Sequence, residues 1–218
     1  MPDLIDRLLA IEVSALCDAD KTLPVVYPTV RAMVPDVRFA GPAFTLRAHD
    51  DHLPVMSALA EAAPGDVLVI ATDGGGLAVF GELFATEAKR RGLAGIVTDG
   101  YCRDVAGLRA LGLPAFSRGT LPRSGTTVSR ARLNQRVRFA GLDVAPGDIV
   151  FGDDDGLVIA SPAQIEAALE TGEAIGRAEG AILRHTRSGQ RSLHELTNWE
   201  THIAALDRGE ESSLGFDV

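Results

Sequence analysis

The sequence predicts an α/β fold in which β layers and helices share one hydrophobic core. Two short apolar runs, "DVLVIAT" at 66–72 and "LAGIVTDG" at 93–100, are typical of strands buried on both faces. Helix-like segments alternate with such runs, which predicts a parallel sheet in the middle third. From about residue 124 the pattern becomes β-rich, which predicts hairpins beside that sheet.

Composition limits the kinds of protein this chain can be. It has 218 residues, 46% of them hydrophobic, enough for a core that needs no disulfide. The net charge of −9 argues against nucleic acid as the main partner, because phosphate binding needs a basic surface. Cys17 and Cys102 stand in no metal-ligand spacing and are expected to be reduced, partly buried thiols.

Before the first buried strand, the expected elements are an amphipathic helix at 3–18, extended chain at 22–35, one or two strands at 37–50 and a helix at 53–63. We expect the strand region to break at Gly41-Pro42, and the helix to end at Pro64-Gly65, because glycine and proline interrupt regular structure.

After the first buried strand, the expected elements are a turn at 73–76, helices at 81–92 and 103–112, strands at 93–100 and 113–119, β structure at 126–161 and a helix at 162–182. The sequences Pro64-Gly65-Asp66 and Pro146-Gly147-Asp148 predict the same kind of turn at two places in the chain. We expect one domain over 1–182 and a helical or extended tail over 183–218.

No segment predicts targeting or membrane insertion. The first residues lack a basic region followed by an unbroken apolar stretch, which a signal peptide needs. No apolar run approaches the roughly 20 residues of a membrane span. The cytoplasm is therefore the expected location, with no membrane partner.

The segment "DGGGLAVFG" at 73–81 is not a known phosphate loop. It lacks Gly-Lys-Ser/Thr, and Val79 stands where the GxGxxG pattern needs glycine. The residues Gly81-Glu82-Leu83-Phe84 open a predicted helix, and the unpaired N–H groups there can bind a carboxylate. A plain helix start is the alternative, because every helix has such an end.

Arg103 and Asp104 follow the second buried strand. An arginine fork holds a carboxylate through two parallel hydrogen bonds, and an aspartate can hold Mg²⁺, which takes one or two carboxylates and keeps several waters. The alternative is an ion pair in which Asp104 caps the next helix. Asp99 is either a second acid nearby or a turn residue.

Other polar clusters are interpreted as loops. The acidic segment 152–156 lacks the distant glutamate of an EF-hand loop, which favours a solvated turn between two strands. His49 and His52 flank two aspartates without an HExxH spacing, which favours a solvated loop.

Together these segments resemble the RraA-like proteins, which include the 4-hydroxy-4-methyl-2-oxoglutarate aldolases. The similarity covers roughly residues 10–180 in the family's order and spacing. It is carried by "FAGPAFTLRA", "PGDVLVIATDGGG", "GELFATEAKRRGLAGIVTDGYCRDVAGLRALGLPAFSRGTLPRSG" and "VAPGDIVFGDDDGLVIASP".

The resemblance implies a layered β/β/α sandwich related to swivelling domains, assembled as a homotrimer or hexamer with sites between subunits. It implies a class II pyruvate aldolase that uses Mg²⁺ or Mn²⁺, cleaves a 4-hydroxy-2-oxo acid to pyruvate and a second oxo acid, and also decarboxylates oxaloacetate. Some members regulate a ribonuclease by binding it, so a non-catalytic, protein-binding role is the alternative. The resemblance does not name the second oxo acid.

The family's signature is a glycine, a spacer of about twenty residues, Arg-Asp, and an acid three residues after the Asp. Its residues here are Gly81, Arg103 and Asp104. The resemblance implies that Arg103 binds the oxo acid, that Asp104 binds the metal, and that the N–H groups of Glu82, Leu83 and Phe84 hold the substrate carboxylate.

Two positions depart from that pattern. Glu82 stands where the aldolases usually have Asp, and Gly107 stands where they usually have an acid. Losing an outer-shell carboxylate weakens metal binding about 10–100-fold. Our hypothesis is that Glu82, acting through a water, removes the proton of the substrate's 4-hydroxyl. Arg123 is a lesser candidate, for binding the distal part of the substrate.

Overall fold

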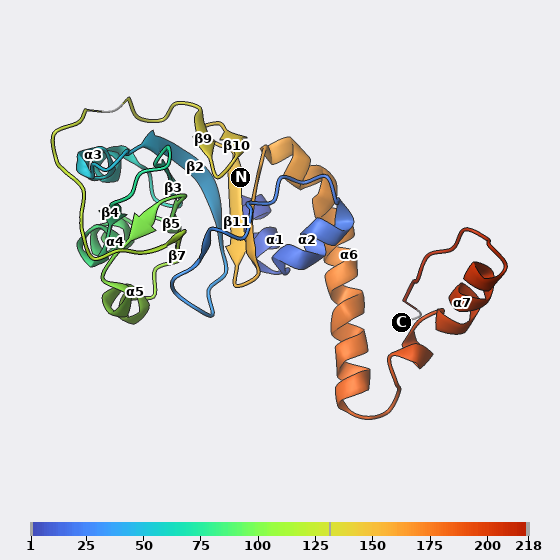
Figure 1. Ribbon diagram of the computed structural model, residues 1–218. Coiled ribbons are helices and arrows are strands. Elements are labelled where there is room, and N and C mark those ends of the chain that lie inside the picture. Colours follow the sequence, from blue (N-terminus) through green and yellow to red (C-terminus); the bar gives the residue numbers. More distant parts are fainter. Residues whose placement is uncertain (1, 131, 217–218) are drawn as a thin grey trace.

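The protein is described here by a computed structural model of residues 2–130 and 132–216. Its centre is a seven-stranded mixed sheet in the order β1-β7-β5-β3-β2-β11-β12 (Figure 1). The strands are β1 (Arg31–Ala32), β2 (Phe39–Arg47), β3 (Val67–Ala71), β5 (Gly95–Thr98), β7 (Ala115–Ser117), β11 (Ile149–Asp153) and β12 (Gly156–Ala160). Strands β2, β3, β5 and β7 run parallel, and β1 and β11 pair antiparallel at either side of them. The predicted α/β class, with a parallel middle third, is confirmed.

A second, smaller sheet positions the site. It contains β4 (Ala78–Phe80), β6 (Tyr101–Cys102) and β8 (Gly119–Thr120), all parallel. These three strands follow β3, β5 and β7 along the chain, so three of the four parallel strands of the large sheet each lead into one strand of the small sheet. The carboxyl ends of β4 and β6 therefore lie side by side.

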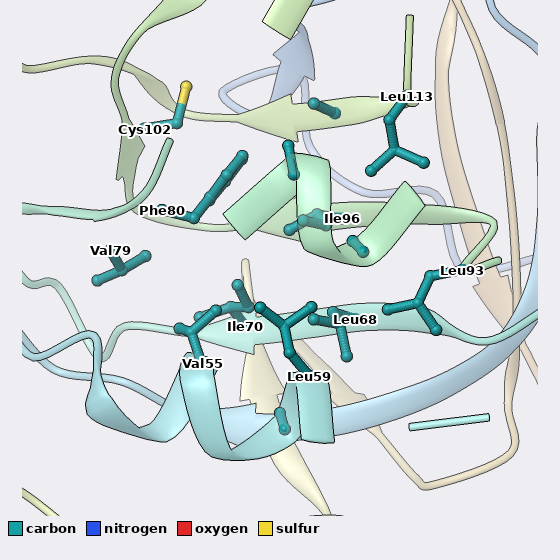
Figure 2. Packing of buried hydrophobic residues seen from close by; sticks show 14 of the residues in the cluster. Val55, Leu59, Leu68, Ile70, Val79, Phe80, Leu93, Ile96, Cys102 and Leu113 are labelled. Atoms are coloured by element: carbon teal, nitrogen blue, oxygen red, sulfur yellow. The ribbon is translucent and has the colours of Figure 1, made fainter. Parts of the chain in front are cut away.

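Three helices cover one face of the parallel strands. They are α3 (Leu53–Glu61), α4 (Glu82–Arg90) and α5 (Val105–Leu111), and all three were predicted. Figure 2 shows Val55 and Leu59 of α3 packed over Leu68 and Ile70 of β3. Every residue of β3 and β5 is buried, which confirms the predicted double-sided burial of both strands.

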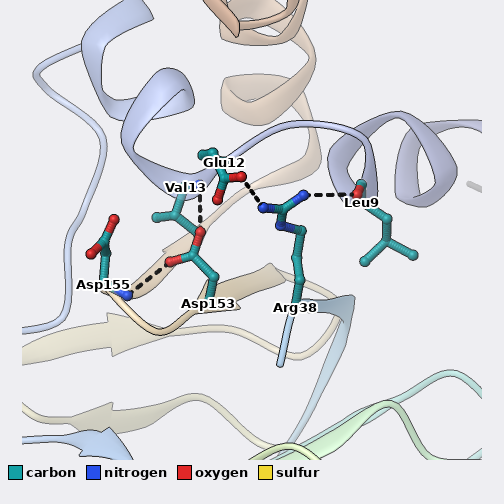
Figure 3. A network of polar contacts seen from close by, with 6 residues as sticks. All are labelled: Leu9, Glu12, Val13, Arg38, Asp153 and Asp155. Atoms are coloured by element: carbon teal, nitrogen blue, oxygen red, sulfur yellow. Dashed lines mark hydrogen bonds and ion pairs between the residues drawn. The ribbon is translucent and has the colours of Figure 1, made fainter. Parts of the chain in front are cut away.

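The opposite end of the sheet is covered by α1 (Pro2–Leu9), α2 (Val13–Ala19) and the long helix α6 (Pro162–Arg187) (Figure 1). The prediction of one helix over 3–18 was wrong, because the chain breaks between α1 and α2. The N–H of Val13 donates to the Asp153 carboxylate at 2.9 Å, and Arg38 pairs with Glu12 in the break (Figure 3). These long-range partners start a new helix at a place where local periodicity would continue the first.

The predicted solvated turn at 152–156 needs a partial correction. Asp154 and Asp155 do form the exposed turn between β11 and β12, but Asp153 is only 6% exposed. Burial raises the pKa of the Asp153 carboxyl, and hydrogen bonds from the N–H groups of Val13 and Asp155 oppose that shift. The carboxylate of Asp153, which lies in the β11–β12 hairpin, thus caps the N-terminus of α2.

Replacing Asp153 by alanine is expected to lower the free energy of unfolding by about 1–2 kcal/mol, the usual cost of losing a helix cap. Urea unfolding followed by circular dichroism measures the change. Asp155→Ala is the matched control, since Asp155 takes part through its backbone N–H and its side chain is exposed. Equal stability of Asp153→Ala and wild type would show that the carboxylate does not hold α2.

The predicted break at Gly41-Pro42 is wrong, because β2 runs without interruption through both residues. Pro42 lacks an N–H, and the parallel pairing with β3 begins only one residue later, at Ala43. A Cβ at position 41 would collide with the carbonyl oxygen of Gly65. Gly41 therefore permits a close approach of the neighbouring turn and does not end the strand.

The predicted β structure starts later than expected. Residues 124–130 and 132–136 contain no strand and only two isolated bridges, at Ser124 and Thr126, before the hairpin of β9 (Val137–Phe139) and β10 (Leu142–Val144). Its turn, Ala140-Gly141, has φ of 46° and 90°, as a tight hairpin turn requires. The preceding loop is held by the Asp51 carboxylate and by separate backbone hydrogen bonds to other segments instead of a strand ladder.

The repeated Pro-Gly-Asp turn is confirmed. Gly65 and Gly147 have φ of 88° and 83°, a conformation that favours glycine. The carboxylates of Asp66 and Asp148 accept from the N–H groups of Ala63 and Ala145, each at 2.8 Å. Both turns thus use a positive-φ glycine followed by an aspartate that bonds back three residues.

Beyond the sheets the chain forms an arm. Helix α6 extends away from the body and leads to η1 (His194–Leu196) and α7 (Trp199–Asp207) at its far end (Figure 1). The expected boundary between residues 182 and 183 falls inside α6, and the division into domain and tail stays a prediction. Across residues 2–130 and 132–216, no helix has both the length and the apolar character needed to cross a membrane.

Candidate active site

The site forms where β4 and β6 end. Phe80 pairs with Cys102, and the N–H of Arg103 donates to the carbonyl of Phe80 at 3.0 Å. This pairing places Gly81, the first residue after β4, beside Arg103 and Asp104, which follow β6. Ligands of α/β proteins commonly bind at the carboxyl ends of parallel strands, which is where these three residues meet.

Gly81 is required by the closeness of this contact. A Cβ at position 81 would lie 2.5 Å from Oδ2 of Asp104 and 2.9 Å from Cγ of Arg103. The backbone of Gly81 is extended, with φ of −161°, so its conformation alone does not demand glycine. Space for the Asp104 carboxylate is what excludes a side chain.

The start of α4 offers free hydrogen-bond donors. The N–H of Glu82 donates to Oδ2 of Asp104 at 3.3 Å. The N–H groups of Leu83 and Phe84 have no partner within the described residues. Of the three N–H groups predicted to hold a carboxylate, two are therefore available at the positive end of the helix dipole.

Arg103 and Asp104 form a loose, accessible pair. Nε of Arg103 lies 3.6 Å from Oδ2 of Asp104, and their side chains are 39% and 44% exposed. Such a pair contributes little to stability, about 0–1 kcal/mol. Asp104 occupies the N-cap position of α5 with φ of 60°, yet its side chain makes no cap hydrogen bond. The cap in the alternative interpretation is therefore wrong, because the carboxylate faces the start of α4 instead.

A cavity of about 110 Å³ lies over these groups. Its lining residues come from four segments: His52; Ala78, Val79, Phe80, Gly81, Leu83 and Phe84; Arg103 and Asp104; and Ser124. A water needs roughly 10–15 Å³ of such space, so the cavity has room for several waters or a small organic acid.

Sequence reasoning missed His52 and Ser124 as site residues. The N–H of His52 donates to the carbonyl of Thr126 at 2.9 Å, which joins the two loops at the cavity. One signal was present in the sequence: His52 shortly follows a strand parallel to its neighbour, and the loops after parallel strands converge at one edge. The position of Ser124 depends on a long irregular loop and had no such signal.

The acidic side chain of Glu82 does not line the cavity. A Cβ at position 107 would collide with the Glu82 carboxylate and lie 2.8 Å from its Cγ. The Glu82 side chain thus rests on Gly107, at the start of α5. Glu82 and Gly107, the two residues that depart from the family pattern, therefore lie next to each other. The longer acidic side chain of Glu82 covers position 107, which lacks the usual acid.

The site fits a hydrated divalent cation held by one carboxylate. Oδ2 of Asp104 faces Arg103 and the N–H of Glu82, whereas Oδ1 makes no hydrogen bond among the described residues. No cluster of three or more His, Cys, Asp or Glu that could hold a metal occurs in residues 2–130 and 132–216. Mg²⁺ tolerates such sparse ligation, because it retains several of its waters.

Other candidates lie outside the cavity lining. Asp99 accepts from the N–H and hydroxyl of Thr72 and from the N–H of Ala140, which makes it an anchor between loops. Arg123 is exposed, and its backbone carbonyl accepts a hydrogen bond from the N–H of Ala78. His49 is exposed and bonds the carbonyl of Thr72 at 2.8 Å.

The fold and the site define a class: α/β proteins in which a glycine-opened helix and an Arg-Asp turn meet at the ends of two paired parallel strands. The chain belongs to the RraA-like family, since the family model described as Aldolase/RraA matches residues 13–159.

Individual relatives agree with this assignment. A Halalkalibacterium halodurans protein named as a putative 4-hydroxy-4-methyl-2-oxoglutarate aldolase is 33% identical over 170 residues, covering 77% of this chain and 81% of that protein. An uncharacterized Pseudomonas syringae protein shares the fold with a TM-score of 0.78 at 24% identity, over 89% of this chain and 96% of its own. A Streptomyces coelicolor protein, described as an unusual member of the RNase ES inhibitor RraA family, has a TM-score of 0.68 at 26% identity, over 87% of this chain and 96% of its own.

Proposed function

We propose that this protein is a divalent-metal-dependent lyase that cleaves 4-hydroxy-2-oxo acids to pyruvate and a second oxo acid, and that it also decarboxylates oxaloacetate. One observation carries the proposal: a single small cavity joins free N–H groups, an arginine and a carboxylate. The relative named as a putative aldolase supports it.

The chain's own groups account for substrate binding and charge stabilisation. The N–H groups of Leu83 and Phe84 bind the substrate carboxylate at the helix start. Arg103 donates to the carboxylate or the 2-oxo oxygen and stabilises the negative charge that develops there as the enolate forms. A Mg²⁺ or Mn²⁺ ion held through Asp104 would supply Lewis-acid polarisation of the 2-oxo group.

Both reactions use the same site. Aldol cleavage and oxaloacetate decarboxylation each break the C3–C4 bond of the substrate and leave pyruvate enolate. The groups that stabilise the enolate therefore serve both substrates. We propose a small oxo acid as the partner, neither nucleic acid nor membrane, and a homotrimer or hexamer that would show three or six times the 23.0 kDa of one chain in light scattering.

The first test is pyruvate formation from oxaloacetate with Mn²⁺ and with EDTA, in wild type and in Asp104→Ala. We expect wild-type turnover to require metal and to fall in the variant by more than about 100-fold, the upper end of the cost of losing an outer-shell partner. Calorimetric titration with Mn²⁺ should show binding to wild type only. Asp143→Ala, at an exposed hairpin position, is the control for a lost surface charge. Wild-type turnover no higher than that of free Mn²⁺ would contradict the proposal.

The second candidate function is a protein-binding regulator of a ribonuclease. The observation that favours it is the structural similarity to the Streptomyces coelicolor member of the RNase ES inhibitor family. A regulator has no need for free N–H donors beside an arginine and an accessible carboxylate, which is why we place the lyase first. Inhibition of a purified ribonuclease by wild type and Asp104→Ala alike, without oxo-acid turnover, would reverse that order.

A further inference from the structure

His52 has a defined place at the cavity. It precedes the first turn of α3, its carbonyl accepts from the N–H of Met56 at 3.2 Å, and its own N–H donates to Thr126. Its ring packs on Phe84 with centroids 5.6 Å apart and an interplanar angle of 53°. The imidazole is thus held by backbone and ring contacts, between the loop and the helix that bound the site.

The ring has hydrogen-bonding capacity to spare. Nδ1 of His52 is buried and has no hydrogen-bond partner among the described residues. The neighbouring carboxylate, Asp51, accepts from Leu53, Thr126, Val128 and Ser129, and no hydrogen bond joins it to the buried Nδ1. A buried nitrogen without a partner is an uncommon feature that a bound ligand or water explains.

The other acid–base candidate is placed less well. The Glu82 carboxylate rests on Gly107 and is not part of the cavity lining, whereas His52 is. The remaining charged lining residues are Arg103, which does not release its proton in proteins, and Asp104, which faces Arg103 and the start of α4. The imidazole is the lining group best suited to exchange a proton with a substrate.

We propose that His52 accepts the proton of the substrate's 4-hydroxyl during aldol cleavage. As the O–H bond breaks, the oxygen forms the carbonyl of the departing oxo acid, and the electrons of the C3–C4 bond become the pyruvate enolate. The proton returns to C3 of the enolate from the imidazolium or from water. Protons and electrons balance without a further reactant. The role rests on the proposed lyase function and identifies the side chain that makes the substrate's hydroxyl reactive.

Comparing aldol cleavage with oxaloacetate decarboxylation distinguishes a proton-transfer role of His52 from a purely structural role. Oxaloacetate has no 4-hydroxyl, so its decarboxylation needs no proton removal from that position. Loss of His52 should therefore lower aldol cleavage and spare decarboxylation, whereas loss of a purely structural contact should lower both.

The experiment measures kcat and KM for 4-hydroxy-4-methyl-2-oxoglutarate and for oxaloacetate in His52→Asn and His52→Gln. We expect kcat for aldol cleavage to fall by about 100-fold, the lower end of general acid–base catalysis, with oxaloacetate turnover close to wild type. His49→Asn is the matched control, because His49 is exposed and does not line the cavity. Urea unfolding checks that each variant is folded.

A parallel loss of both activities in the folded variants would overturn the role, and so would unchanged aldol cleavage. Selective loss of aldol cleavage in Glu82→Gln, with His52→Asn active, would assign the proton to Glu82 instead. Wild type that turns over neither substrate would overturn the lyase function itself, and this inference with it.

Discussion

Replacing Gly81 by alanine is expected to lower turnover by about 100-fold, because small displacements of catalytic groups have effects of that size. The new Cβ would lie 2.5 Å from Oδ2 of Asp104 and 2.9 Å from Cγ of Arg103, so both side chains must move. Both are accessible and end in flexible groups, so the fold should survive. The loss should appear in kcat and in Mn²⁺ affinity, since the Asp104 carboxylate is displaced.

The measurement is oxaloacetate turnover with calorimetric Mn²⁺ titration, beside Gly76→Ala. Position 76 lies in the same connection between β3 and β4, has no atom within 4 Å of an added Cβ and does not have positive φ. The control therefore tests a glycine-to-alanine change without the collision. Full activity in Gly81→Ala would show that the close packing of Gly81 on Asp104 is irrelevant to function.

Replacing Asp51 by asparagine should lower the free energy of unfolding by about 3–4 kcal/mol, because several donors would lose a buried charged acceptor. Asp51 is 1% exposed. Its carboxylate accepts from the hydroxyl of Thr126 at 2.7 Å and from the N–H groups of Leu53, Val128 and Ser129 at 2.8–2.9 Å. Asparagine offers a single acceptor oxygen and would turn an NH₂ group toward other donors.

The same carboxylate should make stability depend on pH. Burial alone would raise the pKa of Asp51, but the hydrogen bonds from Thr126, Val128, Leu53 and Ser129 outweigh burial and hold the pKa well below its usual range. A pKa lowered by folding contributes stability that is complete above the unfolded value of about 3.9 and is lost as pH falls through the folded value.

Urea midpoints measured from about pH 7 down to about pH 3 check both expectations, since wild type should lose stability at the acid end more steeply than Asp51→Asn. Asp143→Asn is the control, because its ion pair with Arg138 is exposed on both sides and contributes at most about 1 kcal/mol. The idea would be falsified by equal midpoints for Asp51→Asn and wild type at neutral pH.

Asp51 also connects stability to the site. It fixes residues 126–129, and the same loop brings Ser124 to the cavity and holds the backbone of His52 through Thr126. We therefore expect Asp51→Asn to weaken activity at temperatures where the protein remains folded. The sequence gives no sign of this, since Asp51 looks like any loop aspartate.

Features that depend on local pattern could be predicted from the amino-acid sequence. The buried strands at β3 and β5, the helices α3 to α5 and the two Pro-Gly-Asp turns follow from apolar runs, helix periodicity and the conformational freedom of glycine. Gly81 and the Arg-Asp pair were also found in this way, because Gly81 opens a predicted helix and the pair follows the predicted strand at 93–100. These features depend on neighbours within a few residues, which the linear sequence displays.

Features that depend on contacts between distant segments could be seen only in the folded protein. The break between α1 and α2 needs Asp153, the continuity of β2 through Pro42 needs the pairing with β11, and the loop before β9 needs Asp51. Likewise His52 joins the site, and Glu82 leaves its lining to rest on Gly107, because of how separate loops and helix starts pack. Long-range hydrogen bonds and steric exclusion override local preference at these positions, since a buried polar group must be paired and two atoms cannot share one space.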